Sequence, residues 1–142
     1  MYKYKYPVNL ESNGEGGYLL KFRDIPEINS EIWSLDELSK TAVGALITAA
    51  DICFEKKMSF PLPSEPMDGE KLVSLPLSVV SKILLHNTIL SANIRPSDLA
   101  KRMGTTPQEI NRVLDLKHST KIDTIQRAFR SLGHDLDVFV TD

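Results

Sequence analysis

Apolar and polar side chains alternate near the beginning of the chain. Residues 4–10 place Tyr, Tyr, Val and Leu at every second position, a period of two that predicts a half-buried β-strand. The glycine-rich segment 13–17 predicts a turn, and residues 18–23 predict the returning strand of a β-hairpin. Residues 28–33 allow a third short strand next to this hairpin.

After Trp33 the period of the apolar residues changes from two to the spacing of a helix. Ser34 and Glu37 have the spacing of a capping box, in which each side chain bonds the backbone amide of the other residue. The apolar residues behind this box form one stripe, which predicts a helix packed against the sheet. They are Leu35, Leu38, Ala42, Ala45, Leu46, Ala49 and Ile52.

Three prolines within residues 61–66 interrupt this regular pattern. They favour an extended, semi-rigid segment, which is typical of a domain boundary. We therefore expect an α+β domain over residues 1–60 and a proline-rich linker with a possible strand over residues 61–75. An all-α domain with a short terminal strand is expected over residues 76–142.

Helical spacing returns beyond Pro76, which suits the first turn of a helix extending to about Ala92. Further along, the segment from Thr120 to Asp123 resembles a capping signal for a helix that ends at Gly133. Its inward residues are expected to be Ile122, Ile125, Ala128, Phe129 and Leu132. Apolar residues at every second position from 136 to 140 predict the terminal strand.

Between these helices lies a segment with the pattern of a helix-turn-helix. A first short helix begins at Pro96 and ends on Gly104, where the backbone is expected to need a positive φ. A second capping box, Thr106 to Glu109, then starts the helix Pro107–Leu114. Two short helices joined by a glycine-containing turn are typical of DNA-binding proteins, although plain helical domains contain such pairs as well.

The exposed side chains of the second helix suit the recognition of bases. Gln108 and Asn111 are able to bond adenine, and Arg112 is able to bond guanine. The cations expected to contact phosphates are Lys101, Arg102, Lys117 and Lys121. Thr106 either caps the helix, contacts a phosphate, or does both.

Charge supports this division of the chain. Residues 1–70 carry 7 Lys and Arg against 12 Asp and Glu, whereas residues 71–142 carry 10 against 7. Residues 95–130 carry 8 against 4, which is the sign needed to approach phosphates. An asymmetry of this size also arises by chance, so charge alone assigns no partner.

Composition excludes several classes of protein. The chain is 42% hydrophobic and 25% charged, as in globular proteins, and no apolar run is long enough to span a bilayer. Residues 1–5 lack an apolar signal core, so a cytoplasmic location is expected. A single cysteine, Cys53, excludes an internal disulfide, and three scattered histidines argue against a zinc site.

The whole chain resembles the HicB antitoxin family, in the subgroup with a C-terminal helix-turn-helix of the Xre/Cro type. The resemblance lies in the order and spacing of short motifs rather than in any one of them. These motifs are Pro7-Val8-Asn9-Leu10, Glu15-Gly16-Gly17-Tyr18, Phe22-Arg23-Asp24-Ile25-Pro26-Glu27, the helix from Ser34, Phe60-Pro61-Leu62-Pro63-Ser64 and the segment from Val73 to Gly133.

The resemblance implies a fold and two partners. The N-terminal domain would be a partial RNase H-like sheet with one packed helix, and it would neutralise a HicA-type toxin, a small basic protein that cleaves mRNA. The C-terminal domain would bind double-stranded operator DNA as a homodimer or tetramer and repress its own operon. We expect toxin contacts from Asp24, Glu27, Glu31 and Trp33 in the acidic half.

Two departures from the family pattern bear on these sites. Ile32-Trp33-Ser34 stands where the family often has a Gly-Asp/Glu-Thr turn, so the toxin contact at Trp33 is expected to differ. Arg95-Pro96 stands where Xre-type domains often have Thr-Gln, so Arg95 is expected to replace the glutamine at the phosphate.

Two other classes of function were considered. A stand-alone transcription regulator would sense a small ligand with its N-terminal domain. A nuclease of RNase H-like fold would need several carboxylates that converge on Mg²⁺, and the first two expected strands carry none internally. The sequence therefore predicts a regulator without enzymatic activity, metal or cofactor.

Overall fold

The computed structural model describes residues 4–142; Met1, Tyr2 and Lys3 lie outside the described residues, and with them most of residues 1–5, which were expected to lack a signal core. The described chain forms two compact units. The first contains the residues up to Lys56 together with Phe60–Pro76, and the second contains Lys57–Ser59 together with Leu77–Asp142. Strands in the first unit and helices throughout the second confirm a mixed α and β protein.

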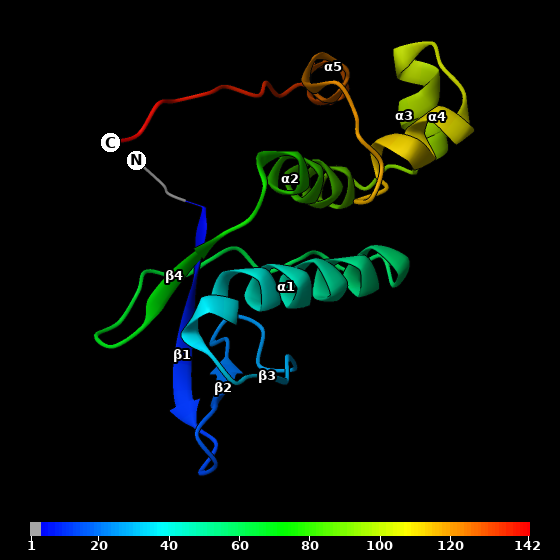
Figure 1. The fold of residues 1–142 in the computed structure, drawn as a ribbon. Helices are drawn as coiled ribbons and strands as arrows, with labels where there is room; N and C mark the ends of the chain where they lie inside the picture. Colours follow the sequence, from blue (N-terminus) through cyan, green and yellow to red (C-terminus); the bar gives the residue numbers. More distant parts are fainter. Residues whose placement is uncertain (1–3) are drawn as a thin grey trace. The chain divides into compact units, whose positions relative to one another are not determined.

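A four-stranded antiparallel sheet is the basis of the first unit (Figure 1). Its strands are β1 (Lys5–Ser12), β2 (Tyr18–Lys21), β3 (Ser30–Ile32) and β4 (Lys71–Ser74), in the order β3-β2-β1-β4. The predicted hairpin is confirmed, since Leu10 of β1 pairs with Leu20 of β2. Its turn depends on Asn13, whose side-chain oxygen accepts the amides of Glu15 and Gly17.

The possible strand within residues 61–75 is confirmed as β4, and it returns the chain to the sheet. Val73 pairs with Tyr6 on the central strand β1, and both side chains are buried. The segment expected to be a linker therefore lies within the first unit. Phe60 anchors its start, because the Phe60 ring is buried edge-on against Tyr6, whose hydroxyl donates to the Pro61 carbonyl at 2.6 Å.

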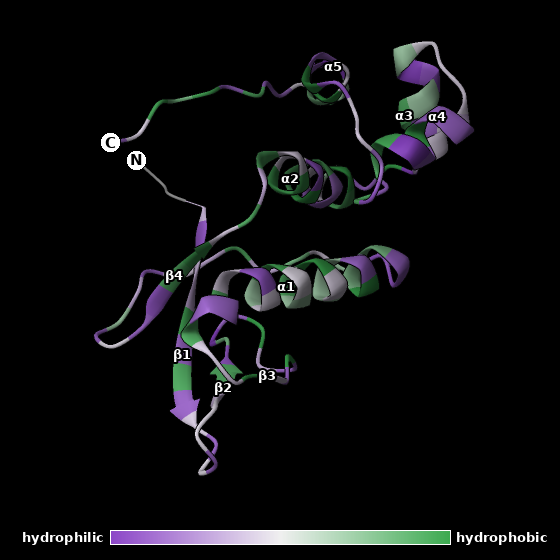
Figure 2. Ribbon diagram, in the orientation of Figure 1, coloured by the Kyte–Doolittle hydropathy of each residue, from purple (hydrophilic) through white to green (hydrophobic). Residues whose placement is uncertain are grey.

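One long helix, α1 (Leu38–Glu55), packs against the sheet of the first unit. Ala42, Leu46 and Ala50 form its fully buried face, so the predicted apolar stripe is confirmed in part, at Ala42 and Leu46. Figure 2 shows hydrophobic and hydrophilic positions alternating along α1. Leu35 and Ile52 were expected on this stripe, but they are about half exposed. Leu35 lies in a short 3-10 turn before α1, and the rotation of the helix brings Ile52 off the buried face.

The capping box predicted before this helix is wrong in its bonds. The Ser34 hydroxyl accepts the amide of Asp36, and the Glu37 carboxylate accepts the amide of Trp33 at 2.9 Å. Both side chains act one residue earlier than expected because the 3-10 turn Leu35–Glu37 precedes the α-helix.

The second unit is helical: α2 (Leu77–Ser91), α3 (Pro96–Met103), α4 (Pro107–Val113) and α5 (Ile122–Ser131). Its core brings together residues from all of these helices. The core members are Leu85, Ile89, Leu99, Ala100, Ile110, Val113, Ile125, Ala128 and Phe129. The helices predicted from periodicity are confirmed to within about two residues at each end.

Two details of the second unit differ from the predictions. Lys121 rather than Thr120 precedes the first residue of α5, and Ile122 is half exposed because it occupies the first position of the helix, outside the buried stripe. The terminal strand predicted at 136–140 is wrong, since the described residues from 134 onward contain no strand. A strand needs a neighbour for its backbone groups, and the second unit supplies only helices.

No single helix within residues 4–142 is both long and apolar enough to cross a membrane. Helices α2 and α3 reach that length and hydropathy only when taken together, and they are bent by 103° at the break between them.

Candidate functional site

Helices α3 and α4 of the second unit form the pair that was predicted as a helix-turn-helix, and they carry the candidate DNA-binding surface. Gly104 ends α3 with φ of 68°, as predicted, and the Thr106 hydroxyl accepts the amide of Glu109 at 3.2 Å to start α4. Ile110 and Val113 of α4 are completely buried. These contacts fix which side of α4 remains exposed.

The three predicted base readers lie on that exposed side. Gln108, Asn111 and Arg112 are all exposed, and the Arg112 side chain keeps 63% of its surface accessible. Glu109 does not complete the predicted capping box; its carboxylate accepts a hydrogen bond from Arg112 at 3.2 Å. A base that binds Arg112 must therefore displace a weak, solvent-screened ion pair.

The cations predicted to bind phosphates are exposed at several places in the second unit. Lys101, Arg102, Lys117 and Lys121 are exposed, and Arg102 donates at 3.4 Å to the Ser131 carbonyl. They come from the end of α3, the turn after α4 and the residue before α5.

Arg95 and Thr106, the two remaining candidates for phosphate contact, already form hydrogen bonds within the chain. The exposed Arg95 guanidinium pairs with Asp98 at 3.3 Å. Hydrogen bonds from the side chain and the backbone of Arg95 lower the pKa of Asp98, which stays ionised. Thr106 caps α4 and is also exposed, so neither of its two expected roles is excluded.

A buried lysine lies at the end of α4, and the sequence analysis missed it. Lys82 of α2 is 1% exposed, and its ammonium group donates to the carbonyls of Asp115 at 2.6 Å and His118 at 2.5 Å. The carbonyl of Arg112 lies 3.4 Å from the same nitrogen. Burial lowers the pKa of Lys82, and the charge of Asp115 opposes this shift. The only sequence signal is a lysine within an apolar stretch of helix.

The four residues expected to contact a toxin differ in their availability. Glu27 and Glu31 are exposed, although Glu31 accepts a hydrogen bond from Asn13. Trp33 is 54% exposed, and its ring lies so close to Gly17 that a Cβ there would be 2.9 Å from the ring. The Trp33 ring therefore packs against Gly17 on one side and is exposed on the other, and it follows directly after the edge strand β3.

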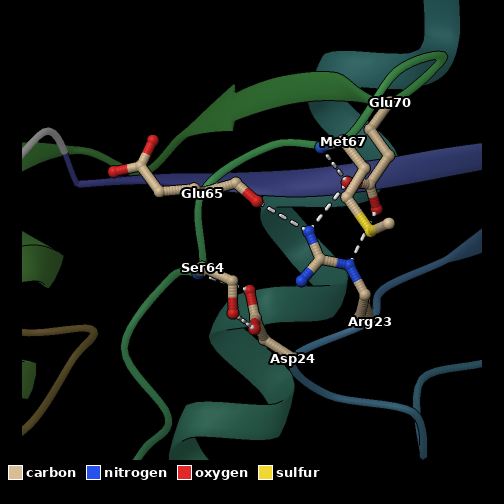
Figure 3. A network of polar contacts seen from close by, with 6 residues as sticks. All are labelled: Arg23, Asp24, Ser64, Glu65, Met67 and Glu70. Carbon is tan, nitrogen blue, oxygen red and sulfur yellow. Dashed lines mark hydrogen bonds and ion pairs between the residues drawn. The ribbon is translucent and has the colours of Figure 1, made fainter.

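Asp24, the fourth expected toxin contact, is engaged within the first unit (Figure 3). Its carboxylate accepts both the amide and the hydroxyl of Ser64. Both carboxylate oxygens of Asp24 are thus already hydrogen-bonded, so they are less available to a partner than the sequence suggested. The bond instead holds the proline-rich segment against the loop after β2.

Arg23 strengthens the same network (Figure 3). Its guanidinium donates at 2.8 Å both to the carboxylate of Glu70 and to the carbonyl of Glu65. The hydrogen bond from Arg23, followed by that from the Met67 amide, lowers the pKa of Glu70. The network borders an open hollow of about 390 Å³ in the first unit. Its walls include Asn9, Lys21, Phe22, Pro26 and Asp68.

Within the described range 4–142, no three His, Cys, Asp or Glu side chains are grouped so that they could hold a metal ion. Cys53 is partly buried in α1, and this burial raises the pKa of its thiol.

Comparison with known proteins defines the class to which this architecture belongs. Residues 5–84 match the family described as HicB_like antitoxin of bacterial toxin-antitoxin system. Antitoxin HicB 1 of Photorhabdus laumondii is 43% identical over 96% of this chain and 86% of its own length. Antitoxin HicB of Escherichia coli K12 is 42% identical over 94% of this chain and 97% of its own length.

A more distant relative, antitoxin HicB of Pseudomonas fluorescens, is 28% identical over 94% of this chain and 90% of its own length. The similarity therefore extends over both units and not over the sheet alone. The protein is an antitoxin of the toxin-antitoxin type. It belongs to the HicB family.

Proposed function

We propose that this chain binds and neutralises a HicA-type mRNA-cleaving toxin and represses its own operon by binding operator DNA, both in the cytoplasm. Membership of the HicB family over nearly the whole chain carries the proposal. The physical division agrees with it, since the acidic half forms the sheet unit and the basic half forms the helical unit. Such a protein acts by binding and needs no catalytic group or cofactor.

In the DNA-binding half, α3 and α4 form an Xre/Cro-type helix-turn-helix. Gln108, Asn111 and Arg112 read bases from the exposed side of α4, and cations on the same unit contact phosphates. The glycine turn, the Thr106 cap and the buried Ile110 support this role, because together they present α4 as a rigid exposed helix.

Binding to operator DNA and to random DNA tests this half. Arg112→Ala should weaken operator binding by about 1 to 3 kcal/mol and leave binding to random DNA nearly unchanged. Arg127→Ala, an exposed arginine on α5, is the matched control and should change both affinities by similar, small factors. Equal losses of Arg112→Ala on both DNAs would contradict base reading by Arg112.

In the toxin-binding half, Trp33, Glu27 and Glu31 form the contact, and Asp24 supports it through Ser64. An exposed aromatic ring beside acidic side chains suits a small basic protein, with the ring as anchor and the charges as steering groups. Leu35, two residues further along the chain, is also half exposed.

The product of the adjacent gene is the toxin to test. It should co-purify with this chain, and Trp33→Ala should weaken the complex at least tenfold in a titration. Glu55→Ala, an exposed acidic residue on α1, should leave the affinity within twofold. If the neighbouring gene encodes no small basic protein, or if its product does not bind, the proposed neutralisation of a HicA-type toxin is wrong.

For the assembly we propose a homodimer or a tetramer, which would place recognition helices on a palindromic operator. The tail after α5 supports self-association, because Val138, Phe139 and Val140 keep 71%, 64% and 97% of their surface exposed. Figure 2 shows hydrophobic positions along this tail. Val138→Asp should lower the mass measured by light scattering, whereas Asp137→Ala should not.

A stand-alone regulator with a ligand-sensing N-terminal domain is the second candidate function. The open hollow in the first unit favours it, since about 390 Å³ falls within the range of small-molecule sites. Its wall contains the Arg23–Glu70 pair, which would have to reorganise around a charged ligand. A metabolite that raises the melting temperature of the chain, together with the absence of a toxin partner, would favour this function.

A further inference from the structure

Lys82 is the most deeply buried charged side chain in the part of the chain that the structure describes. It projects from the middle of α2 and delivers its ammonium group to the C-terminal end of α4 and the turn that follows. Three backbone carbonyls receive it, those of Arg112, Asp115 and His118. An ammonium group has three N–H donors, so the number of acceptors matches the number of donors.

The carbonyl of Arg112 lies in the last turn of α4, and those of Asp115 and His118 lie in the turn that follows it. The last turn of an α-helix leaves carbonyl groups without intrahelical donors, and they carry partial negative charge. Helix α4 has seven residues, which is too short to be stable without tertiary contacts. The carbonyl of Arg112 already accepts the amide of Asp115 at 3.1 Å, and Lys82 adds a second donor to it from a neighbouring helix at 3.4 Å.

Stability alone does not account for a lysine at this place. Withdrawing an ammonium group from water costs several kcal/mol, and an apolar side chain of the same length would avoid that penalty. None of the ion pairs found among residues 4–142 includes Lys82. The lysine donates directional hydrogen bonds to three backbone oxygen atoms, which an apolar residue could not do.

We propose that Lys82 is a positioning residue for DNA recognition, which fixes the end of α4 and the turn 114–118 so that Arg112 and Lys117 meet the operator in register. This inference rests on the proposed DNA-binding function. Lys82 is buried, so it acts through the backbone of the reading segment and not by contact with DNA.

The test compares Lys82→Met with the wild type and with the control Lys40→Met. Methionine has a similar length without the charge, and Lys40 is an exposed lysine on α1 of the other unit. Operator and random DNA are titrated in parallel at a fixed salt concentration. Lys82→Met should reduce the ratio of operator to random affinity about tenfold, and Lys40→Met should leave the ratio within twofold.

Amide hydrogen exchange gives the matching structural readout. In Lys82→Met, exchange should become faster in residues 114–118 while the amides of α3 and α5 keep wild-type rates. Unchanged preference for the operator in a folded Lys82→Met chain would overturn the proposal. Equal loss on operator and random DNA would also overturn it, because a merely structural role weakens both.

Lys82→Arg decides the question if the methionine variant does not fold. The planar guanidinium keeps the charge but does not direct its donors to the same three oxygen atoms. This variant should fold and lose operator preference at least threefold, and full wild-type preference would overturn the proposal. If the wild type itself does not distinguish operator from random DNA, the proposed DNA-binding function is what fails.

Discussion

The two units hold their exposed segments by different kinds of electrostatic contact. In the first unit, Arg23 and Glu70 clamp the proline-rich segment at the surface, where the arginine side chain keeps 36% of its area exposed. In the second unit, Lys82 holds the end of α4 with an ammonium group that is almost fully buried. Water and salt screen the first contact much more than the second.

The backbones of the units differ in a similar way. The sheet joins strands that are far apart in sequence, because β4 pairs with β1 across more than 60 residues. The helical unit includes two short helices, α3 and α4, which have eight and seven residues. A surface clamp is therefore sufficient where the sheet already fixes the backbone, whereas a short reading helix needs buried anchors.

The largest expected effect tests whether the units are stabilised separately. Ile110→Ala removes a fully buried side chain from α4 and should lower the free energy of unfolding of the second unit by about 2 to 5 kcal/mol. The matched variant Leu46→Ala should do the same to the first unit. Urea unfolding followed by NMR signals of each unit checks both variants. If either variant destabilised both units equally, the chain would unfold as one cooperative body.

Replacing one glycine in each unit by alanine should give the next largest change in stability, and the two changes should have opposite signs. Gly104 has φ of 68°, so Gly104→Ala should destabilise the second unit by about 1 kcal/mol through backbone strain alone. Gly44 lies within α1, where an added Cβ meets nothing within 4 Å. Gly44→Ala should therefore stabilise the first unit by about 0.5 to 1 kcal/mol. Melting temperatures check the signs, and a stabilising Gly104→Ala would contradict the left-handed turn.

Local features of the fold could be predicted from the sequence because their causes are local. The hairpin, the Gly104 turn and the Thr106 cap each depend on a few consecutive residues with defined backbone preferences. The side of α4 that faces outward followed from helical spacing alone, which placed Gln108 and Arg112 correctly among exposed residues.

The remaining features depend on partners that are distant in sequence. Nothing near Lys82 indicates that three carbonyls more than 29 residues away converge on it. Asp24 looked available for a toxin because its bond to Ser64 spans 40 residues. The alternating tail suggested a strand, but alternation predicts a strand only where a neighbouring strand exists.

Acid should affect the two units in different ranges of pH. Burial lowers the pKa of His86 in the second unit, so the folded chain keeps this side chain neutral while the unfolded chain binds a proton near pH 6.5. The contribution of His86 to the stability of the second unit should thus be complete above pH 6.5 and fall as the pH drops below it. In the first unit the pKa of Glu70 lies below 4.5, so its contribution should be lost only below pH 4.5.

Unfolding of each unit from pH 8 to 3 checks this separation of ranges. His86→Gln should remove the loss of stability just below pH 6.5, whereas His118→Gln, at an exposed position, should keep it. A slope below pH 6.5 that persists in His86→Gln would show that another group takes up the proton.

The smallest expected effect concerns the surface clamp of the first unit. Arg23→Met removes the hydrogen bonds to Glu70 and to the Glu65 carbonyl, and the loss of stability should be smaller in size than the change caused by either glycine variant. The difference from wild type should shrink as salt rises, because the Arg23–Glu70 pair is partly exposed. Denaturation at low and high salt measures it, with Lys40→Met as the control for a removed charge. A difference that salt does not change would mean that Arg23 stabilises the first unit mainly by packing. Arg23 and the buried Lys82 would then differ in where they lie and not in how strongly salt screens their contacts.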